Sequence, residues 1–372
     1  MTKYKFDEIA INSTQKKKPT EEDKVYYVGL EHIDPGCFDV VRWGSDVAPT
    51  GDKLLMQKGD VLFGKRRAYQ RKVAIAPFDG IFSAHGMVLR PNLKVIDANY
   101  FPFFISSDKF METAVRISVG GLSPTINWKD LARQEFELPS LDEQKVLADK
   151  LWAAYRLKEA YKKLLVATDE MVKSQFIEMY YNTHNKQTLE SVCPIMSKGI
   201  TPKYVESSSV LVINQACIHW DGQRLGNIKY HNEEIPVRKR ILESGDVLLN
   251  ATGNGTLGRC CVFICPSDNN TYINDGHVIA LSTDRAVILP EVLNTYLSLN
   301  DTQAEIYRQY VTGSTNQVDI VFSDIKKMKV PVPSMDEQIL FVEVLTQADK
   351  SKFELKQCIE HIDKVIKSLI NG

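Results

Sequence analysis

The 372-residue sequence lacks any apolar run approaching the ~18 uninterrupted residues of a membrane-spanning helix. Its first residues, 1–7, hold no apolar signal core, so we expect a cytoplasmic protein without membrane contact. Seven cysteines with no regular spacing argue against a disulfide framework and favour a reducing compartment.

An excess of charge is also missing, because 46 Lys and Arg residues nearly balance 47 Asp and Glu residues. A uniformly basic surface is therefore excluded, and any contact with nucleic acid has to come from local patches. The sequence holds no Asn/Asp-Pro-Pro-Tyr/Phe tetrad for an exocyclic adenine amine and no Walker loop for ATP phosphates. We expect neither catalytic residues, nor a metal site, nor a cofactor bound by this chain.

Two weaker motifs support that expectation. Residues 253–258 match G-x-G-x-x-G, but the residues that follow predict a strand where a dinucleotide site requires a helix. Cys260, Cys261, Cys265 and His277 lack the C-x-x-C spacing of a metal site, and alternation of Cys261 with Cys265 favours buried strand positions.

The sequence does contain a long internal repeat. Residues 138–144 read LPSLDEQ, and residues 332–338, 194 positions later, read VPSMDEQ. Residues 59–62 match 245–248, and residues 85–88 match 275–278, at shifts of 186 and 190. The shift grows in order along the chain, as insertions between matched elements would make it, which indicates a duplicated domain and not a solenoid array.

Each copy of the repeated stretch begins a long helix. Ser140 with Glu143, and Ser334 with Glu337, have the spacing of a capping box. No Pro or Gly follows for roughly 35 to 40 residues, which predicts two helices of about 50 Å.

A heptad seam recurs in both helices. Its apolar members in the first helix are Leu147, Leu151, Tyr161, Leu165 and Val172, and in the second Phe341, Leu345, Leu355, Ile359, Ile362 and Ile366. A lysine interrupts each seam at the same place, Lys158 and Lys352. We expect the two helices to pair as an antiparallel coiled coil, although two unrelated amphipathic helices, each packed on its own domain, remain an alternative.

The segments before the helices alternate short β-rich runs with Gly, Pro, Asn and Asp. The predicted fold class is therefore α+β, with two β-rich domains related by pseudo-two-fold symmetry and separated by the helices. We place the domains at 1–139 and 183–333, and the helices at 140–182 and 334–372.

Two loop pairs carry the candidate DNA-binding residues. The first loop is rich in cations, which can take phosphates or guanine edges, while its counterpart is polar and glycine-rich. Their candidate residues are Lys65, Arg66, Arg67, Tyr69, Gln70, Arg71 and Lys72, and, in the counterpart, Asn250, Thr252, Asn254, Thr256 and Arg259. The second pair, just before the helices, offers Ser123, Thr125 and Asn127, and Ser314, Thr315, Asn316 and Gln317. A solvated charge run and ordinary polar turns are the structural alternatives.

Two variable β-rich halves, each closed by a polar turn, a Pro-Ser-x-Asp-Glu-Gln box and a long helix, resemble the specificity subunit of type I restriction-modification systems. The resemblance implies that each half is a target-recognition domain reading one part of a split, asymmetric double-stranded DNA site. It also implies two methyltransferase subunits and restriction-translocase subunits as partners, with S-adenosylmethionine, ATP and Mg bound on those partners.

Half-sites on one face of B-DNA lie about 34–36 Å apart per turn, a separation that helices of the predicted length can span. Two alternatives remain: the recognition subunit of a related split-site system of type IIB character, and a coiled-coil adaptor that binds proteins and no DNA. The salt dependence of DNA binding distinguishes the adaptor from the others.

Overall fold

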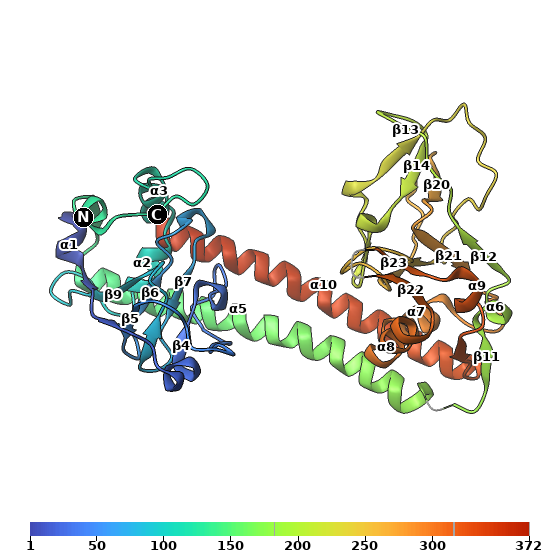
Figure 1. Ribbon diagram of the computed structural model, residues 1–372, viewed down its shortest axis with the longest axis horizontal. Helices are drawn as coiled ribbons and strands as arrows, with labels where there is room; N and C mark the ends of the chain where they lie inside the picture. The colour runs from blue at the N-terminus through green and yellow to red at the C-terminus, as the bar shows by residue number, and fades with distance from the viewer. Residues whose placement is uncertain (182, 315–316, 372) are drawn as a thin grey trace. The chain divides into compact units, whose positions relative to one another are not determined.

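The computed structural model describes residues 1–181, 183–314 and 317–371, and the chain divides into two compact units (Figure 1). Unit 1 comprises Met1–Lys163 with Leu355–Gly372, and unit 2 comprises Leu164–Glu354. Each unit thus contains one β-rich half together with one end of each long helix.

Unit 1 is built on two four-stranded sheets and one two-stranded sheet. The main sheet is antiparallel, in the order β2 (Ala10–Ser13), β9 (Met87–Pro91), β6 (Val61–Phe63), β7 (Val73–Ile75). The second sheet has the order β3 (Lys16–Lys17), β5 (Lys53–Met56), β8 (Gly80–Phe82), β4 (Tyr27–Val28). The pair is β1 (Thr2–Lys5) with β10 (Glu135–Leu138).

The helices of unit 1 are short apart from the ends of the two long ones. They are α1 (Phe6–Ile9), α2 (Phe101–Ser106), α3 (Asp108–Arg116) and α4 (Trp128–Ala132), with the 3-10 turns η1 (Glu21–Tyr26), η2 (Leu30–His32) and η3 (Ala68–Gln70). Three aromatic residues fill the core between them: Phe6 lies 5.3 Å from Phe110 and 5.9 Å from Phe136 between ring centroids.

Unit 2 repeats the plan. Its main sheet has the order β12 (Ile195–Lys198), β21 (Val278–Ser282), β18 (Val247–Asn250), β19 (Cys260–Val262). Its second sheet has the order β13 (Tyr204–Val205), β17 (Lys229–His231), β14 (Val210–Ile213), β20 (Thr271–Asn274). The pairs are β11 (Lys186–Thr188) with β24 (Lys329–Pro331), β15 (Ile218–His219) with β16 (Gly222–Gln223), and β22 (Val311–Ser314) with β23 (Gln317–Ile320).

The remaining helices of unit 2 follow the order of those in unit 1. They are α6 (Leu189–Val192), α7 (Pro290–Ser298), α8 (Asn300–Gln309) and α9 (Phe322–Ile325), with the 3-10 turns η5 (Gln215–Cys217) and η6 (Leu225–Asn227) and the π-helical turn η4 (Ile177–Tyr181).

The main sheets of the two units correspond strand for strand, whereas the second sheets do not. Each second sheet contains one parallel pair, β4 with β8 and β14 with β20. In unit 1 the next strand, β5, pairs with β8, which is the later strand of the parallel pair. In unit 2 the next strand, β17, pairs with β14, which is the earlier strand of the parallel pair. The two halves therefore share the main sheet, whereas the strand order of the second sheet differs between them.

The capping boxes are confirmed at both long helices, α5 (Leu141–Phe176) and α10 (Met335–Asn371). The amide of Ser140 donates to Glu143 Oε2 at 2.9 Å, and the amide of Ser334 donates to Glu337 Oε2 at 2.9 Å. These helices run for 36 and 37 residues, as the absence of Pro and Gly predicts. Neither they nor any other helix in the described ranges is long and apolar enough to cross a membrane.

The glutamine of each repeated box has a structural role that explains its recurrence. Gln144 is buried, donates to the carbonyls of Val95 and Pro139, and accepts from the amide of Asp97 at 2.8 Å. Gln338 makes the same three bonds, to the carbonyls of Val287 and Pro333 and from the amide of Leu289 at 2.8 Å. Each glutamine therefore ties the first turn of a long helix to the segment before α2 or α7.

The two long helices run antiparallel within each unit. In unit 1, Lys158 Nζ lies 2.7 Å from Asp363 Oδ1; in unit 2, Lys352 Nζ lies 2.9 Å from Asp169 Oδ1. The seam lysines and their aspartates are related by the same 194-residue shift, so the two ion pairs are equivalent. Every predicted seam position is buried or half-buried, with Leu151, Val172 and Phe341 at most 5% exposed. Because the helices pair, the alternative of two unrelated amphipathic helices is excluded.

Candidate DNA-recognition loops

The structure brings the two polar loops of unit 1 together. The loop 64–72 follows β6, and the loop 120–127 follows α3. The amide of Ile126 donates to the carbonyl of Lys65 at 3.1 Å, and the amide of Arg67 donates to the carbonyl of Pro124 at 2.7 Å. Arg66 and Thr125 form an isolated antiparallel bridge, so the loops 64–72 and 120–127 form one surface.

Unit 2 joins its two loops in the same way. The amide of Ile320, in β23, donates to the carbonyl of Ala251 at 2.8 Å, and Thr252 bridges to Asp319. Thr252 follows Arg66 by the repeat shift of 186, and Asp319 follows Thr125 by the shift of 194. The bridging residues are therefore equivalent, although none of the four side chains matches its counterpart.

Three cationic side chains of unit 1 lie on this surface. Arg67 Nη2 donates to Ser123 Oγ at 3.1 Å, and Arg66 Nη1 lies 3.4 Å from His85 Nε2. Lys65 is half-buried, and burial together with the charge of Lys16 lowers the pKa of its amine. With no acidic partner recorded for these three among the described residues, the surface is a local cationic patch on a chain of nearly zero net charge.

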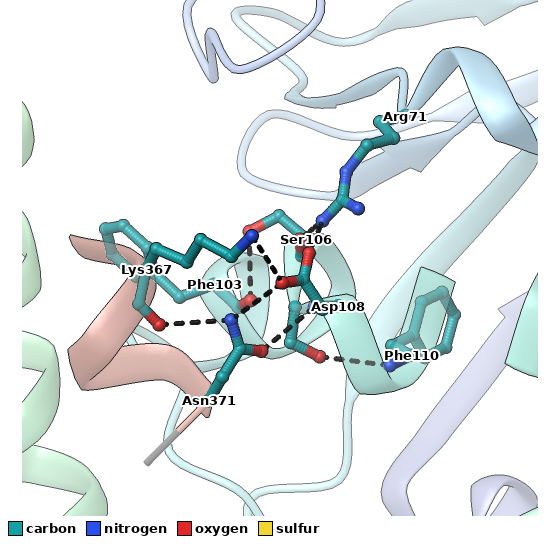
Figure 2. A network of polar contacts seen from close by, with 8 residues as sticks. Arg71, Phe103, Ser106, Asp108, Phe110, Lys367 and Asn371 are labelled. Atoms are coloured by element: carbon teal, nitrogen blue, oxygen red, sulfur yellow. Dashed lines mark hydrogen bonds and ion pairs between the residues drawn. The ribbon is translucent and has the colours of Figure 1, made fainter. Parts of the chain in front are cut away.

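The other two cations of the loop contact their own domain. Arg71 Nη2 donates to the carbonyl of Ser106 at 2.8 Å and lies 2.7 Å from Asp108 Oδ1 (Figure 2). Asp108 in turn contacts the last turns of α10, accepting from Lys367 Nζ at 3.2 Å and from Asn371 Nδ2 at 3.1 Å. Lys72 Nζ donates to the carbonyl of Leu30 at 2.5 Å. Arg71 and Lys72 therefore hold the loop to its domain.

The backbone of this loop is constrained at two arginines. Arg67 and Arg71 have φ values of 56° and 53°, and they are the non-glycine residues with positive φ in the part of the chain that the structure describes. They flank η3, on which Tyr69 is 56% exposed. A left-handed conformation at arginine persists only where surrounding contacts enforce it, so the loop is held in one shape by the carbonyls of Pro124 and Ala68.

The loop of unit 2 has neutral chemistry. Gln215 donates through Nε2 to Thr252 Oγ1 and accepts through Oε1 from Thr256 Oγ1 at 3.3 Å. Asn254 is exposed at the tip, and Arg259 is half-buried at its end. Lys198 Nζ pairs with both carboxylate oxygens of Asp319, at 2.9 and 3.0 Å, which neutralises charge beside the loop.

One predicted contact residue is wrong. Asn250 is 0% exposed, lies in β18 and donates through Nδ2 to the carbonyl of Gln215 at 3.2 Å. Its side chain points into the unit because β18 is a central strand covered on both faces. The prediction placed Asn250 in a loop because its side chain is polar, and polarity does not show that the residue belongs to a buried strand.

The remaining predicted residues divide by position. Asn127 is exposed and begins α4, and Gln70 is half-buried on η3. Ser314 and Gln317 end β22 and begin β23, and Thr315 and Asn316 lie outside the described residues.

Sequence reasoning missed two histidines and a glutamine at these loops. His85 contacts Arg66, while His277 contacts Thr252, which Gln215 also contacts. The only sequence signal was that residues 85–88 fall within a repeated segment, and that match aligned His85 with Asp275.

The core packing predicted for the cysteines and the strand predicted after the glycine-rich motif are confirmed. Cys261 and Phe263 lie in one core cluster with Cys265 packed against it, and burial raises the pKa of the Cys261 thiol to about 12. No group of residues suited to a metal occurs in the described ranges. The motif at 253–258 leads into the strand β19 and not into a helix.

A duplicated α+β frame with two chemically different polar loop surfaces, joined by a pair of capped helices, defines a two-domain recognition subunit. The sequence model of the type I restriction modification DNA specificity domain matches residues 4–165 and again residues 185–363. The chain belongs to this family, and it recognises DNA sequence as the specificity subunit of a type I restriction-modification system.

Known relatives are distant but match over most of the chain. The type I restriction enzyme StySPI specificity subunit of Salmonella potsdam is 22% identical over 94% of this chain and 81% of its own length. The EcoKI specificity subunit of Escherichia coli strain K12 is 20% identical over 94% of this chain and 82% of its own.

Two solved structures share the fold. A chain from a structure describing complex assembly and conformational transition of a type I R-M system has a TM-score of 0.61 at 17% identity, over 99% of this chain and 96% of that one. The S subunit of the type I system from M. genitalium has a TM-score of 0.53 at 14% identity, over 100% and 96%.

Proposed function

We propose that each unit reads one half of a bipartite, asymmetric double-stranded DNA site through its joined loops. The observation that carries the proposal is the equivalence of the bridges Arg66 to Thr125 and Thr252 to Asp319, which hold different chemistry at one architectural position. Arginines favour the acceptor edge of guanine and the phosphates, whereas hydroxyl and amide groups contact a wider set of base edges. Two different surfaces on one frame therefore favour two different half-sites.

The chain further serves as a scaffold for two methyltransferase subunits and for restriction-translocase subunits, and performs no catalysis itself. S-adenosylmethionine, ATP and Mg belong to those partners. Support comes from the long helices, whose outward positions carry apolar side chains that the described chain leaves exposed: Val146, Leu157 and Val365 in unit 1, and Leu164, Met171 and Phe353 in unit 2. The domain division at 1–139, 140–182, 183–333 and 334–372 belongs to the same proposal.

The recognition proposal is tested with the full chain assembled with its methyltransferase partner. Methylation of a randomised DNA library, followed by sequencing, is expected to reveal a split site with two different halves. A complex that methylates without preference for any split sequence would contradict the proposal.

The triple variant Lys65→Ala, Arg66→Ala, Arg67→Ala tests the patch. Removing three phosphate-directed cations should lower DNA affinity and reduce the slope of log affinity against log salt by up to about three. The matched control neutralises three exposed lysines away from the loops, Lys94, Lys203 and Lys229, and should keep the wild-type slope. Equal slopes in the two variants would show that Lys65, Arg66 and Arg67 make no phosphate contacts, and would overturn the patch.

A further inference from the structure

The strand register of the two main sheets places His85 and His277 at the same position. Leu62 pairs with Val88 in unit 1, and Leu248 pairs with Ala280 in unit 2. The first members of these pairs differ by 186 residues and the second by 192. A shift of 192 carries His85 onto His277, whereas the sequence match at 190 had set it opposite Asp275.

The backbone of each histidine turn is fixed from several sides. The carbonyl of His85 accepts from the amide of Arg66 at 3.1 Å, and the carbonyl of His277 accepts from the amide of Ala251 at 2.8 Å. Asp275 Oδ1 accepts from the amide of His277 at 2.9 Å. In unit 1 a Cβ at Gly86 would lie 2.1 Å from the ring of Phe82, so only glycine fits after His85. In the hydrogen bonds, the two histidines use only main-chain atoms, so these bonds hold both turns whatever side chain replaces the imidazole.

Both imidazole rings are exposed, and each touches the bridging residue of its own unit. His85 Nε2 lies 3.4 Å from Arg66 Nη1, and His277 Nδ1 lies 3.0 Å from Thr252 Oγ1. The groups that the two rings contact, the Arg66 guanidinium and the Thr252 hydroxyl, belong to the residues that bridge the two loops of each unit.

The contacts of each ring indicate its hydrogen-bonding role. Burial and the charges of Arg66 and Lys65 lower the pKa of His85, which favours its neutral form. Because a guanidinium only donates, Nε2 accepts and the proton of His85 sits on Nδ1. Thr252 Oγ1 accepts from Gln215 and also shares a hydrogen bond with His277 Nδ1. An imidazole carries at least one N–H whichever nitrogen holds it, so each unit presents an exposed histidine donor beside its bridging residue.

We propose that His85 and His277 are matched specificity-determining residues, each donating to a base acceptor in the half-site that its unit reads. An imidazole donor suits purine N7, guanine O6 or thymine O4 in the major groove. The neighbouring residue then distinguishes the two halves, since Arg66 adds a positively charged group that only donates while Thr252 adds a neutral hydroxyl. The inference rests on the proposed recognition of a bipartite site.

The experiment compares His85→Ala and His277→Ala, each in the full chain assembled with its methyltransferase partner, on the randomised methylation library. His85→Ala should relax base preference at one or two positions of one half-site by roughly 10- to 100-fold and leave the other half-site unchanged. His277→Ala should do the same in the opposite half-site. His184 is exposed and lies in sequence between the sheets of the two units. His184→Ala is therefore the control, and it should keep the wild-type base preference.

Gln substitutions at both positions keep a donor and separate recognition from folding. Thermal unfolding of every variant should match the wild type, because the turns are held by main-chain bonds. Unchanged base preference, or equal weakening on every sequence, would overturn the inference while leaving the bipartite site intact. Absence of any split preference in the wild type would instead overturn the proposed function, so the two failures are distinguishable.

Discussion

Asp108 is the residue through which the cationic loop of unit 1 meets the end of α10. It lies at the first position of α3, and Ser107 caps that helix by accepting from the amide of Phe110 at 3.1 Å. Burial opposes ionisation of Asp108, but bonds from Lys367 and Arg71 outweigh it and hold the pKa of its carboxyl below the usual value. Arg71 therefore stabilises the unit, and the reading surface is left to Lys65, Arg66 and Arg67.

At the residue scale we expect Asp108→Asn to lower the free energy of unfolding by about 1–2 kcal/mol at pH 7, because charge-assisted bonds are lost. A folded pKa below the unfolded value of about 3.9 means that the ionised group stabilises the fold above that pH and loses its effect as pH falls through the folded pKa. Urea unfolding at pH 7, 4 and 3 should show the difference between variant and wild type shrinking below about pH 4.

Asp52→Asn is the matched control for that prediction, since Asp52 is exposed and makes no ion pair among the described residues. A difference for Asp108→Asn that is the same at every pH would show that ionisation of this carboxyl is unimportant. Protection of the amides near Lys367 and Asn371 from hydrogen exchange should fall in the variant at neutral pH, because the last turn of α10 loses its anchor.

Each long helix is fixed at its start by a buried polar contact as well as by its apolar face. Gln144 and Gln338 are both 0% exposed, and each satisfies three main-chain groups that flank a long helix. Buried amides without partners are costly, so replacement of this side chain affects more than one hydrogen bond. The Asp-Glu-Gln part of the repeat thus begins each long helix and, through its glutamine, hydrogen-bonds that helix to the preceding segments of the unit.

At the element scale we expect Gln338→Ala to lower the free energy of unfolding by about 3 kcal/mol, since the carbonyls of Val287 and Pro333 and the amide of Leu289 lose their partner. Gln347→Ala, an exposed site on the same helix, should change stability by no more than about 0.5 kcal/mol. Chemical unfolding followed by circular dichroism measures both. Equal effects at the two glutamines would disprove this role of the buried glutamine.

The whole molecule repeats one ion pair in two places, and this repetition defines how the long helices align. Lys158 with Asp363 and Lys352 with Asp169 each place a charged group in an otherwise apolar seam. A polar residue in such a seam lowers stability but specifies register and orientation, because a shifted pairing would leave the lysine without its carboxylate. The equivalence of both pairs indicates the same antiparallel alignment of the helices within each unit.

At the scale of the molecule we expect the charge reversal Lys158→Asp to be destabilising and Asp363→Lys to restore about 1–2 kcal/mol of it in the double variant. The same should hold for Lys352→Asp with Asp169→Lys. Combining Lys158→Asp with Asp169→Lys should give no rescue, because those residues lie on one helix and in different ion pairs. Double-mutant cycles by thermal unfolding measure the couplings, and rescue by the mismatched combination would contradict the register.

The sequence alone determined the duplication, the two capped helices, their seam and the family. Those features depend on local sequence patterns: S-x-x-E at a helix start, a heptad repeat, and long stretches without Pro or Gly. Patterns of this kind depend on residues a few positions apart, which is why the sequence reveals them directly.

The tertiary structure alone decided which polar residues face the reading surfaces. It buried Asn250, paired Arg71 and Lys72 with groups of their own domain, joined the loops 64–72 and 120–127, and set His85 equivalent to His277. Each outcome depends on strand register and on contacts between segments far apart in the chain. One residue of slip in a strand reverses the direction of every side chain, and composition cannot reveal that register.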